Sequence, residues 1–285
     1  MGSSITPLFD HLLLMLKTES DDTSYAWLQG RIEILETSWS LQAFHLAFGL
    51  AGRKFPRRVP ARDNHSDTVR SKRFGRVLPF SWTLDQMART VLLIRGLEQQ
   101  PGTQARFVKD ILDTADAWEQ IAVYSSMSLL PAPESYLPLA IHGLRTNIKP
   151  VFESIALHNP YPADFFPQDA WNQMYLKAAF IESDILGIMD IPRRSNESLS
   201  HIILDYVHER WAAGREVMPA FWYATTHYLT EGHLAALQKL AEHKEQYQRA
   251  VPAMICKDNP VPALLELPLS IPDSWDWHTI SQSTN

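Results

Sequence analysis

The sequence predicts an all-α protein, either a single-domain multi-helix bundle or a short α-superhelix with antiparallel neighbouring helices. Apolar side chains recur with the helical period along most of the 285 residues. Glycine is scarce, with 11 Gly against 19 Pro, which argues against a sandwich or barrel whose turns need glycine. The sequence contains no convincing pair of strands, and its short connections favour antiparallel packing of successive helices.

Periodicity and helix-start signals place the elements of the first half. Ser81 is typical of an N-cap, and Asp85 then lies in the first helical turn, where a carboxylate is favoured. Residues 53–79 form a basic, proline-punctuated loop. Helices are expected at about residues 5–17, 24–50, 81–95 and, as one bent helix or two short ones, 103–128.

Prolines divide the second half. Pro131 and Pro133 break the chain, and a helix from about residue 138 is expected to bend near Pro150, where a backbone donor is lost. Three prolines within residues 158–167 favour extended backbone, so this segment is not expected to be helical. Helices resume at about residues 168–182, 196–213, 217–229 and 231–248.

The domain organisation follows from these patterns. We expect one all-α domain over residues 1–250 and a Pro-rich tail at 251–285, part of which packs on the body through Trp275 and Trp277. The stretch Arg53–Arg76 contains nine Lys or Arg and two Asp, a net charge of +7. It is either a solvated loop or a clamp for an anionic ligand or an acidic partner. Few aromatic residues accompany these bases, which argues against nucleic acid as the partner.

Composition bounds the class of protein. The formal charge of −6 and the single cysteine, Cys256, are typical of a cytoplasmic protein. One cysteine excludes an internal disulfide framework and a cysteine-rich zinc module. The early apolar run Leu12–Leu16 is far shorter than the ~18 residues of a membrane span. It also lacks the flanks of a signal peptide, so we expect no membrane span.

Motifs of common enzyme classes are missing. The sequence has no phosphate-binding glycine loop, no dinucleotide fingerprint, no G-x-S-x-G elbow and no H-E-x-x-H. On the helix at 196–213, His201, Asp205 and His208 share one face. Such a face suits either a divalent metal or a solvated, hydrogen-bonded polar surface. Because the sequence offers no second carboxylate–histidine pair on a matching helix, we expect the polar surface and no metal site. Arg210 lies on the apolar face of the same helix, where it needs a carboxylate partner or a ligand anion.

Three further features are candidates for a site. Lys177 lies beside apolar residues, so it is a desolvated base or nucleophile, a snorkelling lysine, or a lysine paired with Glu182 or a carboxylate of the next helix. The loop that begins at His158 combines proline stiffness with polar groups, which suits either a binding site or a structural corner. Arg145 is the candidate anchor for an anion.

Four segments carry a family resemblance: Arg145–Asn147, His158–Phe165 (HNPYPADF), Trp171–Ala178 (WNQMYLKA) and Asp205–Arg215 (DYVHERWAAGR). Together with SWTLDQMART at 81–90, they resemble the EboA family over about residues 81–222. The resemblance implies an accessory role in a small gene cluster that makes or exports a secondary metabolite. Neighbouring genes of such clusters encode proteins that resemble a metal hydrolase, a prenyltransferase, a cyclase and an isomerase. The resemblance carries over no reaction and no catalytic residue.

The leading hypothesis is an accessory protein that binds a polar, anionic intermediate or a partner enzyme of the same cluster. One alternative is an enzyme with Lys177 or His158 as its acid–base or covalent group. Another is a structural module that forms a homo-oligomer or scaffold. The sequence names no cofactor. The predicted ligand-binding residues are Arg145, Asn147, Asn159, Tyr161, Asp164, Asn172, Asp205, His208 and Arg210.

Overall fold

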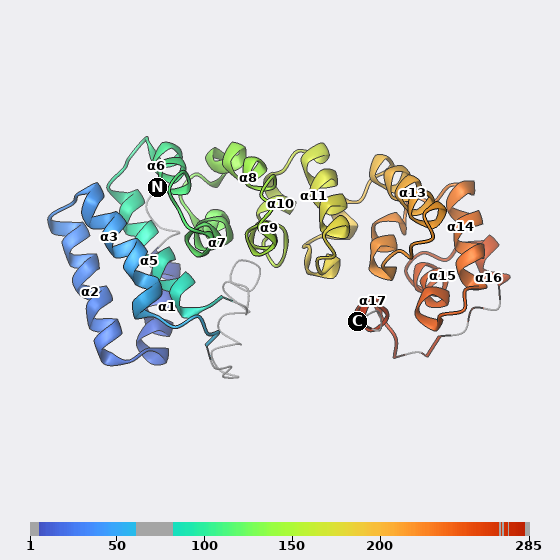
Figure 1. The fold of residues 1–285 in the computed structure, drawn as a ribbon, viewed down its shortest axis with the longest axis horizontal. Helices are drawn as coiled ribbons and strands as arrows, with labels where there is room; N and C mark the ends of the chain where they lie inside the picture. Colours follow the sequence, from blue (N-terminus) through green and yellow to red (C-terminus); the bar gives the residue numbers. More distant parts are fainter. Residues whose placement is uncertain (1–5, 61–81, 268, 270, 273, 283–285) are drawn as a thin grey trace. The chain divides into compact units, whose positions relative to one another are not determined.

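The computed structural model describes residues 6–60, 82–267, 269, 271–272 and 274–282 of the chain. The regular elements of these residues are helices, and no β-strand is found among them (Figure 1). The predicted all-α fold is therefore confirmed. The chain divides into two compact units, Met1–Phe166 (unit 1) and Pro167–Asn285 (unit 2). The single domain expected over residues 1–250 stays a prediction.

Unit 1 is built around two helices that lie side by side, α5 and α7. α5 is buried along most of its length and packs against α1, α2, α3 and α7, and α7 also packs against α9 (Figure 1). The helices of unit 1 are α1 (Thr6–Glu19), α2 (Asp22–Thr37), α3 (Leu41–Lys54), α5 (Leu84–Glu98), α6 (Gln104–Leu112), α7 (Ala117–Ser126), η1 (Met127–Leu129), η2 (Pro133–Tyr136), α8 (Leu137–Gly143), α9 (Lys149–Ala156) and α10 (Tyr161–Phe165).

Unit 2 packs around the 3-10 helix η4, which contacts α13, α15 and α17. The predicted packing of the tail is confirmed at Trp277, whose Nε1 donates to Asp258 at 2.8 Å and whose ring lies 5.2 Å from that of Tyr223. The helices of unit 2 are α11 (Gln168–Phe180), η3 (Ile185–Gly187), α12 (Ile191–Arg194), α13 (Glu197–Ala212), η4 (Pro219–Thr225), α14 (Glu231–Ala241), α15 (Gln246–Asp258), α16 (Pro262–Leu265) and α17 (Trp277–Gln282).

Several expected helices are divided in the structure. The helix expected at 24–50 is two helices, because Ser40 caps α3 by accepting from the Ala43 amide at 3.1 Å. The helix expected at 231–248 is likewise α14 and α15, and α15 continues through Pro252 to Asp258. The residues expected at 217–229 form η4 instead of an α-helix. Two short helices, α6 and α7, cover most of 103–128.

Prolines also act differently from the expectation. Pro150 does not bend a continuous helix: it lies in the first turn of α9, where its missing amide hydrogen is not needed. For the same reason Pro162 fits the first turn of α10, so the segment 158–167, expected to be non-helical, contains a short helix. Thr83, rather than Ser81, is the N-cap of α5.

Two expectations lie partly or wholly beyond this description. Ser81 and most of the basic loop expected at 53–79 fall outside the described residues, although Arg53 and Lys54 still belong to α3. No helix in the described parts of the chain combines the length and apolarity needed to cross a membrane.

Candidate functional site

A groove of about 270 Å³ lies in unit 1 at the junction of three helices. Three lining residues of α9 and its C-cap residue Leu157 follow the i, i+3, i+4, i+7 spacing of one face, and the segments at α5 and α7 each contribute a pair at i, i+4. The opposite face of α9 is buried against the core. The lining residues are Trp82, Gln86, Ile121, Ser125, Pro150, Glu153, Ser154, Leu157, His158 and Asn159. We call this hollow the α5–α7–α9 groove.

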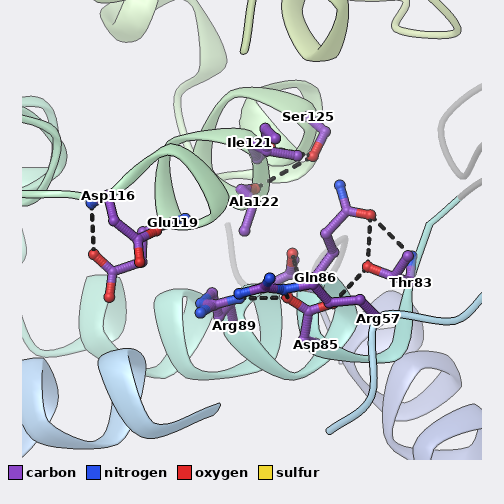
Figure 2. Close-up of polar contacts among 11 residues, drawn as sticks. Arg57, Thr83, Asp85, Gln86, Arg89, Asp116, Glu119, Ile121, Ala122 and Ser125 are labelled. Carbon is purple, nitrogen blue, oxygen red and sulfur yellow. Dashed lines mark hydrogen bonds and ion pairs between the residues drawn. The ribbon is translucent and has the colours of Figure 1, made fainter. Parts of the chain in front are cut away.

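Gln86 is held in one orientation by the start of α5. Its Oε1 accepts from the Thr83 backbone amide at 2.9 Å, which completes a capping box. A backbone amide can only donate, so the oxygen must face Thr83 and the Nε2 group must face away. Figure 2 shows the amide nitrogen of Gln86 pointing away from Thr83. No described residue accepts a hydrogen bond from that nitrogen.

A buried ion pair next to this capping box stabilises the position of Thr83. Arg89 donates to Asp85 at 2.6 Å, and both side chains are almost fully buried. The other carboxylate oxygen of Asp85 accepts from the Thr83 hydroxyl at 2.6 Å (Figure 2). The ion pair therefore holds Thr83, whose backbone amide orients Gln86, in place. Gly52 makes room for the guanidinium, because a Cβ there would lie 2.5 Å from Nη2 of Arg89. Arg57 lies 3.8 Å from Asp85 at the exposed edge.

His158 reaches the groove from the residue after the C-cap of α9, and its φ is +52°. Glycine usually holds this left-handed position, since a side chain there is unfavourable. Asn159 fixes the turn: its amide donates to the carbonyls of Ser154 at 2.9 Å and Tyr124 at 3.2 Å, and it accepts from the Tyr161 amide at 3.0 Å. The structure thus places His158 and Asn159 in one groove, while the amide of Asn159 serves the turn.

The other predicted residues of unit 1 lie elsewhere. Arg145 is exposed beside a shallower hollow of about 410 Å³, whose further lining residues, including His142, come from α8. Asn147 and Asp164 are exposed and do not line the groove. Tyr161 is buried with its hydroxyl donated to the Pro133 carbonyl at 2.6 Å, and burial raises its pKa.

The predicted residues of unit 2 fall into three environments. Lys177 on α11 is partly buried, and desolvation lowers its pKa. Asn172 is buried, and its amide exchanges hydrogen bonds with Asn196, the N-cap of α13. Asp205 and His208 are exposed on α13.

Arg210 differs from its expectation. It lies in the last turn of α13, so its side chain reaches past the end of the helix and donates to the Glu216 carbonyl at 3.0 Å. The guanidinium of Arg210 is only partly buried, and its partner is a main-chain carbonyl instead of the expected carboxylate or ligand anion. Within the described residues, no group of three His, Cys, Asp or Glu side chains is arranged to hold a metal ion.

A sequence model of the family described as "Metabolite traffic protein EboA" matches residues 8–226. The chain belongs to the EboA family. The EboA match contains every residue that lines the α5–α7–α9 groove. A search of curated proteins and a search of solved structures each returned no match.

Sequence reasoning missed most of the groove. Gln86, Glu153 and Ser125 come from three different helices, and no local sequence pattern predicts that they line one groove. One signal was readable: Thr83-x-x-Gln86 is a capping-box pattern, which fixes where the helix starts and how the glutamine points. The expected N-cap at Ser81 was inconsistent with this capping-box pattern, which requires Thr83 as the N-cap.

Proposed function

We propose that this protein is an accessory protein that binds a small metabolite without transforming it, and that the α5–α7–α9 groove is the binding site. The observation that carries the proposal is a hollow of ligand size in which apolar walls surround an oriented amide donor. Ligand sites are typically concave and apolar with a few placed polar groups, and volumes of about 300 Å³ mark their lower end. The groove therefore suits a small molecule.

Two further observations support this proposal. The EboA family is described as a metabolite traffic protein, which fits binding and release better than turnover. The left-handed backbone of His158 also lies at the groove. Residues with such strained backbone cluster at functional sites, where the surrounding structure holds them in place. We also propose that the protein acts with an enzyme of the same pathway, that its gene belongs to the cluster of that pathway, and that the protein forms a homo-oligomer.

The test is native mass spectrometry of the full chain purified from its own host, with the denatured protein as a control. We expect a non-covalent adduct that denaturation removes. Ser154→Trp places an indole on the groove face of α9 and is expected to abolish the adduct. Ser198→Trp makes the same exchange at an exposed position of α13 and is expected to keep it. An adduct that persists at full occupancy in Ser154→Trp would contradict the groove as its site.

A second candidate function rests on Lys177. Partial burial lowers its pKa, which increases the fraction of neutral amine available to attack a carbonyl. An enzyme of this kind would form a Schiff base, and borohydride would trap it as a stable adduct on Lys177 when the protein is mixed with a host extract of carbonyl metabolites. Lys177→Arg is the control, and the absence of an adduct that depends on Lys177 would remove this candidate.

A further inference from the structure

We infer that Arg57 and Trp118 form an anchor for an anionic group, a carboxylate or a phosphate, at the open edge of the α5–α7–α9 groove. This inference rests on the proposed function, because the body of the ligand would occupy the groove while its anionic group binds the anchor. The anion expected from the sequence was assigned to Arg145, which lines the other hollow. Arg57 belongs instead to the basic stretch for which an anion clamp was one interpretation.

Two contacts hold Arg57 in place. The carbonyl of the next residue, Arg58, accepts from the Leu84 amide at 3.0 Å, which ties this segment to the first turn of α5. The guanidinium carbon of Arg57 lies 4.1 Å from the ring centre of Trp118, within the range of a cation–π contact. Both side chains are still more than 40% exposed. A guanidinium that is already held over a ring loses little conformational freedom when it binds an anion.

The hydrogen-bond donors of Arg57 are available to a ligand. Its Nε lies 3.8 Å from the carboxylate of Asp85, which is too far for a hydrogen bond. No acceptor in the described parts of the chain takes up the hydrogens of its two Nη groups. A guanidinium can donate from its edge while its face stacks on a ring, and two parallel N–H groups match the oxygens of a carboxylate or phosphate.

The charges around Arg57 favour an anion. Asp85 is shared by two guanidinium groups, and the nearer one, Arg89 at 2.6 Å, is buried with it. One carboxylate and two guanidinium groups together carry a net charge of +1. On α7, Asp116 and Glu119 are bound to each other's backbone in a capping box, at the opposite side of the view from Arg57 (Figure 2). Asp85 therefore compensates the charge of Arg57 only in part.

The groove adjoins this anchor. Trp118 lies one turn before the lining residue Ile121 on the same face of α7. From the α5 side, the Nε2 group of Gln86 offers a neutral donor, because its Oε1 is held by the cap. Glu153 lies across the groove on α9 with Lys149 3.8 Å away, so its charge is paired. An anionic group is thus favoured at the Arg57 edge, and the rest of a small ligand fits the hollow.

The experiment titrates the full chain with benzoate and benzamide, which have the same size and both offer an oxygen to Gln86 but differ in charge. Binding is followed through the NMR resonances of the Trp118 indole N–H, the Gln86 side-chain amide and the Ser125 backbone amide. We expect benzoate to bind about fivefold more tightly, because charge-assisted hydrogen bonds are strong and solvent screens part of the gain. Raising the salt concentration from about 50 mM to about 500 mM should weaken benzoate and leave benzamide unchanged.

Arg57→Gln is the decisive variant. It removes the charge at a half-exposed position, so the fold is expected to survive. We expect it to lose the preference for benzoate and to bind benzamide like the wild type. Arg106→Gln makes the same exchange on α6, where the arginine is exposed and 3.9 Å from Asp110, and it should keep the preference. Trp118→Leu removes the ring beside the guanidinium and should reduce the preference to about twofold.

Phenyl phosphate is the third probe, and it distinguishes the two kinds of anion. The anchor is expected to prefer it to benzamide as well. The tighter binder of phenyl phosphate and benzoate then identifies the anionic group that the anchor fits better.

The outcomes separate the two claims. If the groove resonances shift but benzamide binds the wild type as tightly as both anions, or Arg57→Gln keeps the preference for benzoate, the anchor is wrong and the groove remains a binding site. If none of the three probes shifts the Gln86 or Ser125 resonance at its solubility limit, the groove is not a binding site, and the proposed function falls together with this inference.

Discussion

At the scale of single residues, His158 holds a backbone conformation that a side chain disfavours. Replacing it with glycine removes the left-handed penalty, whereas alanine keeps the penalty and loses the imidazole. We expect His158→Gly to be about 1 kcal/mol more stable than His158→Ala. Urea unfolding of both variants measures the difference. Equal midpoints would mean that the backbone of residue 158 carries no strain.

The buried pair of Asp85 and Arg89 is the second residue-scale feature. Asp85→Asn keeps the size of the side chain but leaves the guanidinium of Arg89, which is only 2% exposed, without its charge partner. We expect a loss of about 3 kcal/mol or more in the free energy of unfolding, because an uncompensated buried charge is strongly destabilising. Asp113→Asn in the exposed pair with Lys109 is the control and should change little. Similar losses in both variants would contradict this role.

At the scale of elements, Gly96 lets α5 approach α3 closely. A Cβ at Gly96 would lie 2.8 Å from the ring of Phe44, whose ring also packs 4.9 Å from that of Phe107. Gly96→Ala should therefore destabilise the protein by about 1–3 kcal/mol.

Gly30 provides the matched comparison in the interior of α2. A Cβ there meets nothing within 4 Å, so Gly30→Ala should stabilise the protein by about 0.5–1 kcal/mol. Thermal melts of the two variants are expected to move in opposite directions. A Gly96→Ala variant as stable as Gly30→Ala would mean that α3 and α5 separate easily.

The same scale shows what periodicity could and could not predict. The positions of α11 and α13 follow from the sequence, because each is a continuous amphipathic stretch with flanking signals. The break between α2 and α3 does not follow, since the apolar period continues through Ser40 and only the side-chain cap interrupts the helix. Propensity and period describe the interior of a helix better than its ends.

At the scale of the whole molecule, His233 makes stability depend on pH. Its Nδ1 accepts from the Thr230 amide at 3.1 Å, so the proton lies on Nε2, which donates to the Ser200 carbonyl at 3.0 Å. Burial lowers the pKa of His233 below its ordinary value of 6.5. Below pH 6.5 the unfolded chain therefore binds a proton that the folded chain does not, and the free energy of unfolding falls as the pH falls.

Urea unfolding between pH 7.5 and pH 5 checks this expectation. His233→Gln should flatten the dependence on pH, while His227→Gln, at an exposed position of unit 2, should keep it. An unchanged slope in His233→Gln would show that other groups set the dependence.

The groove also belongs to this scale, which explains why the sequence predicts only part of it. His158 and Asn159 stood out because their loop is rich in proline. Gln86 and Glu153 lie 67 positions apart in the sequence and become neighbours of one hollow only because α7 packs between α5 and α9. That adjacency is a property of the tertiary arrangement, and no single helix encodes it.

The capping box at the start of α5 has a kinetic consequence. The Thr83 amide hydrogen exchanges with solvent only when the first turn opens and Gln86 lets go of it. A molecule bound to the other end of the Gln86 amide would slow that opening. Binding of a molecule in the groove would then be detected as slower deuterium uptake at the Thr83 amide, even if the molecule is unidentified.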